Sequence, residues 1–341
     1  MNRQPYLEAV RDRVIVFDGA FGTFVQDLDL GPADFGGESL EGCNEMLCLT
    51  RPDVIESMHR AFLDAGVDAI ETASFGSFST VLAEYNISEQ AYELNVAAAS
   101  IARRVADSYE SDGRPRYVAG SIGPGTKLPS LGHIDFITLR DSYEEQARGL
   151  IDGGADLFLI ETCMDLLQIK AAMQACRRAM SACGRTLPIQ VQVTMETTGR
   201  MLVGTEIGAA YASLQAMKPD VIGINCATGP SEMQEHLRYL SQHSQIPISV
   251  LPNAGLPSVR DGKTHYDLTP EQLAEFHRRH VADLGIGIVG GCCGTTPEHL
   301  RQVVEAVRGI ALKQRTPEFE PSVSSLYSPV TLAQDNSFLI I

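Results

Sequence analysis

Eight short apolar runs, each followed by a segment with helical periodicity, constrain the fold of this chain more than any other feature. The runs are residues 14–17, 69–71, 117–119, 157–160, 189–193, 221–224, 248–251 and 286–289. Runs this apolar are typical of parallel strands that are buried on both faces. Eight alternations of strand and helix predict an α/β fold, the (β/α)8 TIM barrel.

Helix-start and helix-stop residues support the alternation. One helix is predicted to begin at Pro52 and to end before Gly66. Another is predicted to begin after Thr269, with Gln272 placed for a capping box and Gly285 just beyond its end. A weak internal echo also supports a repeated unit, because two helix ends lead through glycine into strands that finish in Glu-Thr, at 71–72 and at 161–162.

Charge and hydropathy narrow the class of protein. With 43 acidic and 27 basic residues the net charge is −16, which opposes binding to nucleic acid or to an anionic membrane. No run approaches the ~18 apolar residues of a membrane span, and the first residues lack the apolar core of a secretory signal. We therefore expect a cytoplasmic protein, whose eight cysteines are reduced.

The barrel pattern stops near residue 310. Residues 316–325 are rich in proline and serine, as linkers are, and the chain ends in the apolar run FLII at 338–341. We expect a barrel over residues 1–310, followed over 311–341 by a linker and the start of a second module. The apolar ending suggests one module of a longer protein.

Polar side chains stand at the ends of nearly all the predicted strands. Barrel enzymes place their active sites at the C-terminal ends of their strands, where these groups would converge. No comparable set follows the helices. The strand-end residues are Asp18, Glu71, Thr72, Ser121, Glu161, Thr162, Thr194, Asn225, Cys226, Asn253, Cys292 and Cys293.

Three of these residues form a candidate metal site. Cys226 follows the sixth predicted strand and the Cys292-Cys293 pair follows the eighth, so only the seventh strand separates them. Catalytic zinc sites hold three protein ligands and keep a fourth position open. Neighbouring residues of a strand point to opposite faces, so the pair can bind one ion only where the backbone bends. Three glycines make that bend inexpensive: Gly290, Gly291 and Gly294.

Other interpretations of the cysteines remain open at this point. The pair could be packing cysteines or a redox-active vicinal disulfide. Cys163 follows a strand end and is an alternative ligand. The remaining cysteines have no ligand partner nearby and are interpreted as bystanders: Cys43, Cys48, Cys176 and Cys183.

Three thiolates favour one kind of zinc chemistry. They place negative charge on the ion and weaken its power to activate water. Such an ion is better suited to an incoming thiol, which loses its proton on coordination and becomes a soft nucleophile for carbon. The site therefore predicts alkyl transfer to sulfur.

Six motifs, in the same order, resemble those of the zinc-dependent homocysteine S-methyltransferases, and the resemblance runs from about residue 10 to residue 310. GCNE at 42–45 and LT at 49–50 look most like the N-terminal homocysteine modules of the cobalamin-dependent members, the methionine synthases. Residues 325–341 are similar to the linker into their folate-binding module. The six motifs are DGAFGT at 18–23, ET at 71–72, GSIGP at 120–124, ET at 161–162, GINC at 223–226 and GGCCGT at 290–295.

This resemblance implies a reaction and a set of roles. It implies that Zn2+ is held by Cys226, Cys292 and Cys293. Homocysteine would accept a methyl group from methylcobalamin on a separate module and become methionine. The partners would be cobalamin-binding and folate-binding modules of the same longer chain.

The resemblance also implies the substrate contacts. The amino and carboxylate groups of homocysteine would be held by Asp18, Glu161 and backbone amides at Gly19, Ala20 and Thr23. An ammonium group pairs with carboxylates, and a glycine-bearing loop can direct N–H groups at a carboxylate. The alternative for Asp18 is a carboxylate that caps its own loop.

Asn253 is singled out by position. It ends the strand between those that carry the cysteines, so its side chain should face the metal region. We hypothesise that its oxygen fills the open zinc position when substrate is absent. The alternative is an asparagine that only ties down its loop.

Three alternative functions make different demands on the sequence. A cobalamin-independent enzyme would take its methyl group from betaine or S-methylmethionine, which calls for an aromatic pocket, yet the chain has no tryptophan and 6% aromatic residues. A non-catalytic zinc module would hold four protein ligands. A sugar-phosphate enzyme is disfavoured, because no lysine ends a predicted strand.

Overall fold

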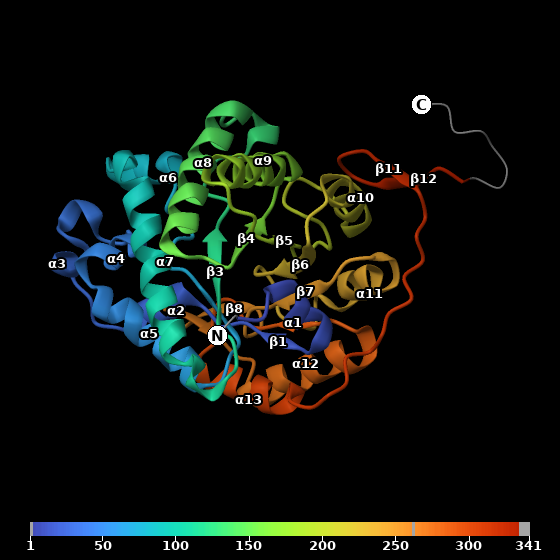
Figure 1. The fold of residues 1–341 in the computed structure, drawn as a ribbon. Helices are drawn as coiled ribbons and strands as arrows, with labels where there is room; N and C mark the ends of the chain where they lie inside the picture. The colour runs from blue at the N-terminus through green and yellow to red at the C-terminus, as the bar shows by residue number, and fades with distance from the viewer. Residues whose placement is uncertain (1–2, 261–262, 334–341) are drawn as a thin grey trace.

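Eight parallel strands form a closed barrel in the computed structural model, which describes residues 3–260 and 263–333 (Figure 1). Strands that follow one another around the barrel pair in chain order, β1 pairs with β10, and a parallel bridge between Phe17 and Ala69 closes the ring. The predicted (β/α)8 fold is confirmed. The strands are β1 (Ile15–Val16), β2 (Ala69–Glu71), β3 (Tyr117–Ile122), β4 (Leu157–Cys163), β5 (Ile189–Val193), β6 (Val221–Asn225), β7 (Ile248–Leu251) and β10 (Ile288–Val289).

Eight helices surround the barrel, each with a buried apolar face against the strands (Figure 1). They are α5 (Pro52–Asp64), α7 (Ala91–Ser108), α8 (Phe136–Gly153), α9 (Leu166–Cys183), α10 (Ile207–Met217), α11 (Gln234–His243), α12 (Pro270–Leu284) and α13 (Pro297–Val307).

Shorter elements decorate the loops. Four are helices: α2 (Phe21–Gln26), α3 (Pro32–Phe35), α4 (Leu47–Thr50) and α6 (Ser79–Leu82). Six are 3-10 turns: Glu38–Leu40, Asn44–Met46, Ala83–Tyr85, Ser88–Gln90, Glu110–Asp112 and Pro129–Leu131. Two antiparallel hairpins complete the set, β8 (Pro257–Arg260) with β9 (Lys263–Tyr266) and β11 (Ser322–Ser324) with β12 (Pro329–Thr331).

The predicted helix ends are confirmed. The Thr269 side chain accepts a hydrogen bond from the backbone N–H of Gln272. The Gln272 side chain accepts one from the backbone N–H of Thr269, which completes the expected capping box. Gly285 follows α12 with φ +66, and Gly66 lies just past α5 with φ +95. Both glycines therefore take the left-handed conformation that ends helices.

Several predicted strand boundaries are wrong. The eighth strand begins at Ile288 instead of residue 286, because the Ile286 amide donates to His280 O (3.1 Å) and so closes helix α12. Strands β3 and β4 run further than predicted, to Ile122 and Cys163. Ser121 and Glu161 therefore lie in the last residues of these two strands and not in the loops beyond.

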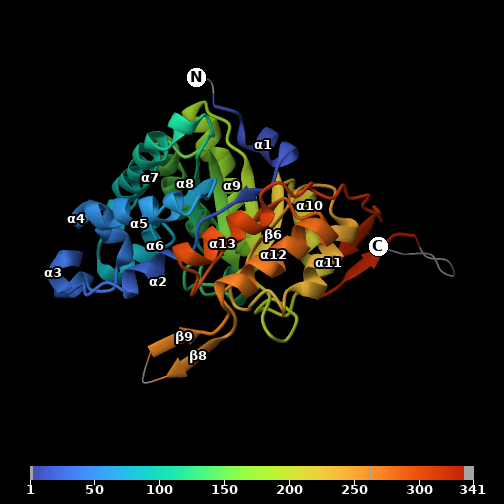
Figure 2. The same ribbon diagram turned by 90° about the horizontal axis from the view of Figure 1, so that it is seen from below.

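The N-terminal end of the barrel is plugged by α1 (Tyr6–Asp12). The buried Tyr6 hydroxyl donates to Gln190 Oε1 at 2.7 Å, and its ring packs edge-on against Phe17 and Tyr117. Figure 2 shows α1 and the β8–β9 hairpin at opposite ends of the molecule. Access to the barrel interior is therefore at the C-terminal ends of the strands, the mouth.

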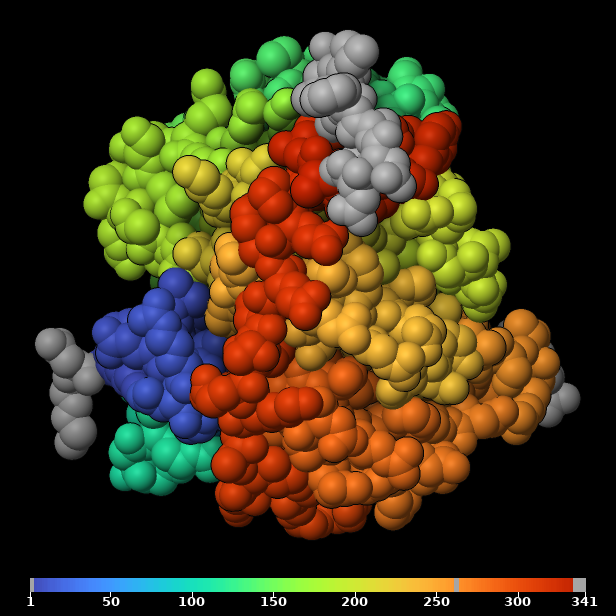
Figure 3. All heavy atoms as spheres, turned by 90° about the vertical axis from the view of Figure 1, so that its right-hand side faces the viewer, coloured from blue at the N-terminus to red at the C-terminus, as the bar shows by residue number. Residues whose placement is uncertain are grey.

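Residues 311–333 form a strap along the outside of the barrel. Figure 3 shows it as a red band lying over the yellow and orange helices. The Glu318 amide donates to Gln242 O (2.8 Å), and the Tyr327 carbonyl accepts from the Glu206 amide (2.9 Å). The stretch predicted to be a linker is thus seated on the barrel. A module boundary at 310 stays a prediction, and the apolar run at 338–341 lies outside the described residues.

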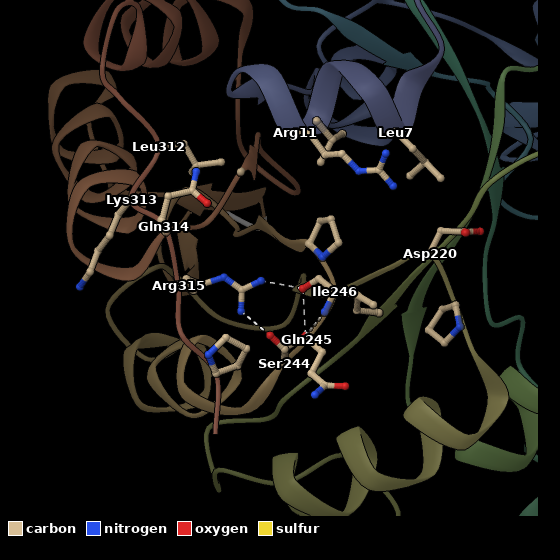
Figure 4. A pocket seen from close by; sticks show the side chains of 16 residues that line it. Leu7, Arg11, Asp220, Ser244, Gln245, Ile246, Leu312, Lys313, Gln314 and Arg315 are labelled. Atoms are coloured by element: carbon tan, nitrogen blue, oxygen red, sulfur yellow. Dashed lines mark hydrogen bonds between the residues drawn. The ribbon is translucent and has the colours of Figure 1, made fainter. Parts of the chain in front are cut away.

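A cavity of about 490 Å³ lies between α1 and the start of the strap (Figure 4). Arg315 spans it, donating to Ser244 O at 2.6 Å and to Ile246 O at 2.7 Å. None of its lining residues is a cysteine, and it lies at the plugged end of the barrel. This cavity belongs to the seat of the strap and not to the strand-end site.

The β8–β9 hairpin, inserted between β7 and α12, was not predicted. It projects from the mouth side of the barrel (Figure 2) and brings Tyr266 against Gly294. Within residues 3–260 and 263–333, no helix combines the length and apolarity needed to cross a membrane.

Candidate metal and substrate site

The three predicted cysteines come together at the mouth. Their sulfur atoms lie within 4.8 Å of one another, and Cys226 Sγ is 3.8 Å from Cys293 Sγ. Two sulfurs bound to one zinc at ~2.3 Å in tetrahedral geometry are about 3.8 Å apart. The donor set and its spacing therefore fit a zinc ion, with Cys226, Cys292 and Cys293 as ligands.

The backbone at Cys226 has an unusual conformation. Cys226 and Ala227 have φ of +60 and +56, a region that residues with side chains rarely adopt. The end of β6 stays paired with β7, because the backbone N–H of Cys226 donates to Leu251 O at 3.2 Å. Strain of this kind concentrates at functional sites, where surrounding structure enforces it. Here it turns the thiol toward the cysteine pair.

The bend predicted for residues 290–294 is present, but its glycines act in different ways. Gly294 alone of the three has a positive φ (+78). Gly290 and Gly291 are needed because a side chain at either would collide with neighbouring groups, among them Phe17 and Thr295. The pair itself is anchored through its backbone, since the Cys292 amide donates to Pro252 O at 2.8 Å.

The three thiols share charge unequally. Hydrogen bonds from Cys226 and Cys292 lower the pKa of Cys293 to about 3, and the Tyr266 hydroxyl adds to this effect. Contacts with Cys226 and Cys293, together with burial, raise the pKa of Cys292 well above its usual range. One thiolate is thus stabilised by two protonated neighbours, whose protons a cation would displace.

A cavity of about 240 Å³ opens beside the thiols. Its walls come from the C-terminal ends of β2, β3 and β4 and from the loops after β1, β2, β6 and β10. In the described part of the chain, Asp18 and Asn253 are the two predicted site residues that do not line it. Those that do are Gly19, Ala20, Thr23, Glu161, Cys226, Cys292 and Cys293.

Glu161 is the buried acid of this cavity. Its Oε1 accepts from Ser121 Oγ at 2.5 Å and its Oε2 accepts from Asn225 Nδ2 at 3.2 Å. Burial raises the pKa of Glu161 to about 7, although these two hydrogen bonds oppose the shift. A cationic ligand would favour the ionised form and so suits this position.

Asp18 lies behind the cavity wall. It is 1% exposed, and both its carboxylate oxygens lie 3.1 Å from the Glu71 amide. Its carboxylate therefore accepts from the neighbouring strand β2. The alternative prediction was that this carboxylate caps its own loop. Burial raises the pKa of Asp18 well above its usual range, and the nearby Glu161 adds to the shift.

Glu71 was noted as a strand-end residue but was given no role. It lines the cavity, and its Oε1 is buried without a hydrogen-bond partner among the described residues. Burial raises the pKa of Glu71 well above its usual range, with Glu161 and Asp18 adding to it. The echo between the two Glu-Thr pairs was the signal that could have identified Glu71 as a partner of Glu161.

This cluster of buried acids predicts that Glu71→Gln stabilises the fold. A carboxylate whose pKa is raised by folding costs stability as pH rises above its ordinary value of about 4.3, and an amide does not. We expect the Tm at pH 8 to rise by about 2–4 °C, the shift that ~1 kcal/mol gives in a large domain.

Thermal unfolding at several pH values tests this expectation. The gain should vanish near pH 4, where Glu71 itself is neutral. A lower Tm for the variant at pH 8 would show that the Glu71 carboxylate stabilises the fold.

Asn253 follows β7, between the strands that carry the cysteines. It is 3% exposed, and its side-chain Oδ1 has no partner within the described ranges. Its loop is held by backbone bonds, from the Asn253 amide to Thr228 O (3.1 Å) and from the Gly255 amide to Asn253 O (2.7 Å). The unpaired acceptor is therefore not what ties down the loop.

Cys163 is not brought to the thiol cluster. It is buried, and its thiol donates to Glu161 O at 3.4 Å. The four cysteines interpreted as bystanders are also outside the cluster. The structure thus separates the three sulfurs of the site from the five others.

Some cavity residues were not anticipated at all. Asn44 and Glu45 come from the long segment between β1 and β2, and Phe75 comes from the loop after β2. Glu45 is held in place because its Oε1 accepts from the Gly76 amide at 2.8 Å. The GCNE motif at 42–45 contributed to the family resemblance, but no local pattern showed that it reaches the mouth.

The sequence has close relatives among longer proteins. A family profile described as homocysteine S-methyltransferase matches residues 15–307. The methionine synthase of Mycobacterium tuberculosis (strain ATCC 25618 / H37Rv) is 52% identical over 335 residues, which are 98% of this chain and 28% of that protein. The methionine synthase of Mycobacterium leprae (strain TN) is 51% identical over 340 residues, with the same two shares. The chain thus spans 28% of the length of these relatives.

The fold also matches solved structures. The homocysteine methyltransferase MmuM from Escherichia coli, in its oxidized form, gives a TM-score of 0.71 at 23% identity, over 88% of this chain and 98% of that one. Its metallated form gives 0.69 at 23% identity, over 86% and 96%. At this identity the likeness concerns the fold, whereas the profile covers the barrel from β1 to α13. The chain belongs to the homocysteine S-methyltransferase family.

Proposed function

We propose that this chain is the homocysteine-activating module of a methionine synthase. The observation that carries the proposal is the cavity in which three thiols at zinc spacing face buried carboxylates. A zinc ion on Cys226, Cys292 and Cys293 would supply a position where the substrate thiol is bound as a thiolate. Three free thiols need a reducing compartment, so we place the module in the cytoplasm.

The chain's own residues would orient the substrate. Glu161 and Glu71 both line the cavity, and an ammonium group between them would relieve the repulsion of two buried acids. We assign Asp18 the role of holding the β2 backbone, and through it Glu71, in position. The substrate carboxylate would lie against the backbone of residues 19–23, which also lines the cavity.

The methyl donor would reach the mouth on another module. The relatives named methionine synthase are longer than this chain, which supports further modules in the same protein. In this proposal methylcobalamin is bound by a separate cobalamin-binding module, and residues 311–341 are a linker and the start of a folate-binding module. Two phenylalanines, Phe21 and Phe75, are the aromatic residues of the described cavity lining. Two aromatic lining residues give little support for the aromatic cage that a cationic methyl donor would need.

The test is zinc content followed by product formation. The zinc-loaded chain should form methionine from homocysteine with added methylcobalamin, and should not do so with betaine or S-methylmethionine. Turnover with either of the latter donors would replace the proposal by a cobalamin-independent enzyme. Zinc binding with no product from any donor, and with no homocysteine binding, would indicate a non-catalytic zinc module.

We also propose that Asn253 Oδ1 occupies the fourth zinc position in the absence of substrate. The support is its buried, unpaired oxygen beside the strands that carry the thiols. Asn253→Ala should then change the zinc edge spectrum of the substrate-free protein, while the two proteins should give the same spectrum once homocysteine is bound. Identical substrate-free spectra would rule out this ligand.

A further inference from the structure

Two fully buried histidines lie behind the metal site and were not singled out in the sequence. His277 and His280 are one helical turn apart on α12, and both are 0% exposed. Their rings meet edge to face, with centroids 5.5 Å apart. Buried imidazoles are costly unless their nitrogens are hydrogen-bonded, so the partners of these rings matter.

The partners connect the two loops that carry the cysteines. His277 Nε2 is 2.8 Å from the carbonyl oxygen of Gly290, which begins the 290–294 loop. His280 Nδ1 is 3.4 Å from His277 Nδ1, and His280 Nε2 is 3.1 Å from Gln234 Nε2. Gln234 also donates to Pro230 O at 3.4 Å, in the loop that follows Cys226.

The chemistry of these groups fixes which atom donates and which accepts in each of these hydrogen bonds. A carbonyl oxygen only accepts, so His277 Nε2 carries the proton and its Nδ1 accepts. His280 therefore donates from Nδ1, and its Nε2 accepts from Gln234 Nε2, because an amide nitrogen only donates. Burial lowers the pKa of His277 to about 4, in keeping with a neutral ring. Every ring nitrogen thus has a partner and no proton position is left free.

We infer that His277 is a positioning residue for the metal site. The hydrogen bonds that run from Gly290 through His277, His280 and Gln234 to Pro230 fix the 290–294 loop relative to the loop that carries Cys226. The inference rests on the proposed zinc function. A three-sulfur site binds its ion well only if the two loops keep the distance at which the sulfurs match zinc. Hydrogen bonds made directly to metal ligands typically account for ~10–100-fold in metal affinity, and we take this range as the guide for a link that reaches the ligands through Gly290.

A second buried histidine offers a matched control. His59 lies on α5, is 0% exposed, and neither of its ring nitrogens has a hydrogen-bond partner in the described part of the chain. Replacing either residue by alanine removes a buried imidazole and leaves a cavity. Only the His277 change cuts the link to Gly290.

The experiment measures zinc affinity by competition with a chromophoric chelator, using the full 341-residue chain. We expect His277→Ala to bind zinc about 10–100-fold more weakly, His277→Gln to recover most of the loss by donating to the same carbonyl, and His59→Ala to match the parent. The sulfur-to-metal charge-transfer band of the cobalt-loaded protein should change in His277→Ala and not in His59→Ala.

Two results would overturn the inference: parent-like zinc affinity in His277→Ala, or an equal loss in His59→Ala. Should His277→Ala not fold, Gln234→Leu cuts the same chain at a half-buried position, and unchanged affinity there would count against it. The parent's own affinity separates the two proposals. A parent that binds no zinc refutes the proposed function, whereas a parent and a His277→Ala variant that bind equally refute only this inference.

Discussion

Replacing Cys292 with serine is expected to abolish both zinc binding and homocysteine binding while leaving the barrel folded. The thiol lies at the mouth, above a core formed by strands and helices that does not depend on it. Zinc affinity should fall more than ~100-fold, since losing a ligand must exceed the ~10–100-fold cost of losing a hydrogen bond around one. Circular dichroism and zinc content, measured on the same sample, check both parts.

Cys183→Ser is the matched control for this prediction. Cys183 ends α9 and is not part of the thiol cluster, so its zinc content and homocysteine affinity should equal those of the parent. Full zinc content in Cys292→Ser would contradict the assignment of this cysteine as a ligand. Loss of the folded signal would instead show a structural role for the site.

Glu161→Gln is expected to produce the second-largest effect, on substrate affinity. The amide keeps the shape of the side chain but cannot neutralise an ammonium group in a buried site. Removing one partner of a buried charged pair costs about 2–5 kcal/mol, so homocysteine should bind at least about 30-fold more weakly. Zinc content should be unchanged, which separates this variant from the cysteine variants.

The pH dependence of binding gives an independent check. The pKa of Glu161 is raised to about 7, so the carboxylate needed for the ammonium group is lost as pH falls below that value. Thiol coordination also releases a proton, so homocysteine should bind more weakly at lower pH in both the parent and the Glu161→Gln variant. Between pH 5.5 and 6.5, the slope of log affinity against pH should be greater in the parent than in Glu161→Gln by about 1, which corresponds to one more proton released on binding.

A buried acid four residues further along the chain serves as a control that tests whether burial alone explains the loss. Asp165 is fully buried, but its carboxylate accepts from Ser130 and from the Leu167 amide at the start of α9, and it does not line the cavity. Asp165→Asn should lower stability and leave homocysteine affinity near that of the parent. Equal losses of affinity in the two variants would contradict a direct role for Glu161.

The barrel could be predicted because its signal is local. Strands buried on both faces read as apolar runs, such as residues 189–193 and 248–251, whose predicted and observed limits agree. The cysteine site could be predicted for a related reason, since the barrel brings all strand ends to one face. The position of Cys226 relative to the pair then follows from strand order alone.

Features that depend on contacts between distant segments were missed. Asp18 faces the β2 backbone because of how β1 and β2 lie side by side, which no spacing in the sequence reveals. Glu45 reaches the mouth only through the path of a long loop, and His277 reaches Gly290 from the outer helix layer. The eighth strand was predicted too long because Ile286 is apolar, although its amide serves the end of α12.

The open position of a three-cysteine zinc site is expected to receive the sulfur of homocysteine. Zinc edge X-ray absorption of the zinc-loaded chain, before and after homocysteine is added, counts the sulfur ligands of the ion. We expect three sulfur ligands and one lighter ligand in the free protein, and four sulfur ligands once homocysteine is bound. A sulfur count that stays at three while homocysteine is bound would show that the substrate thiol does not coordinate the zinc.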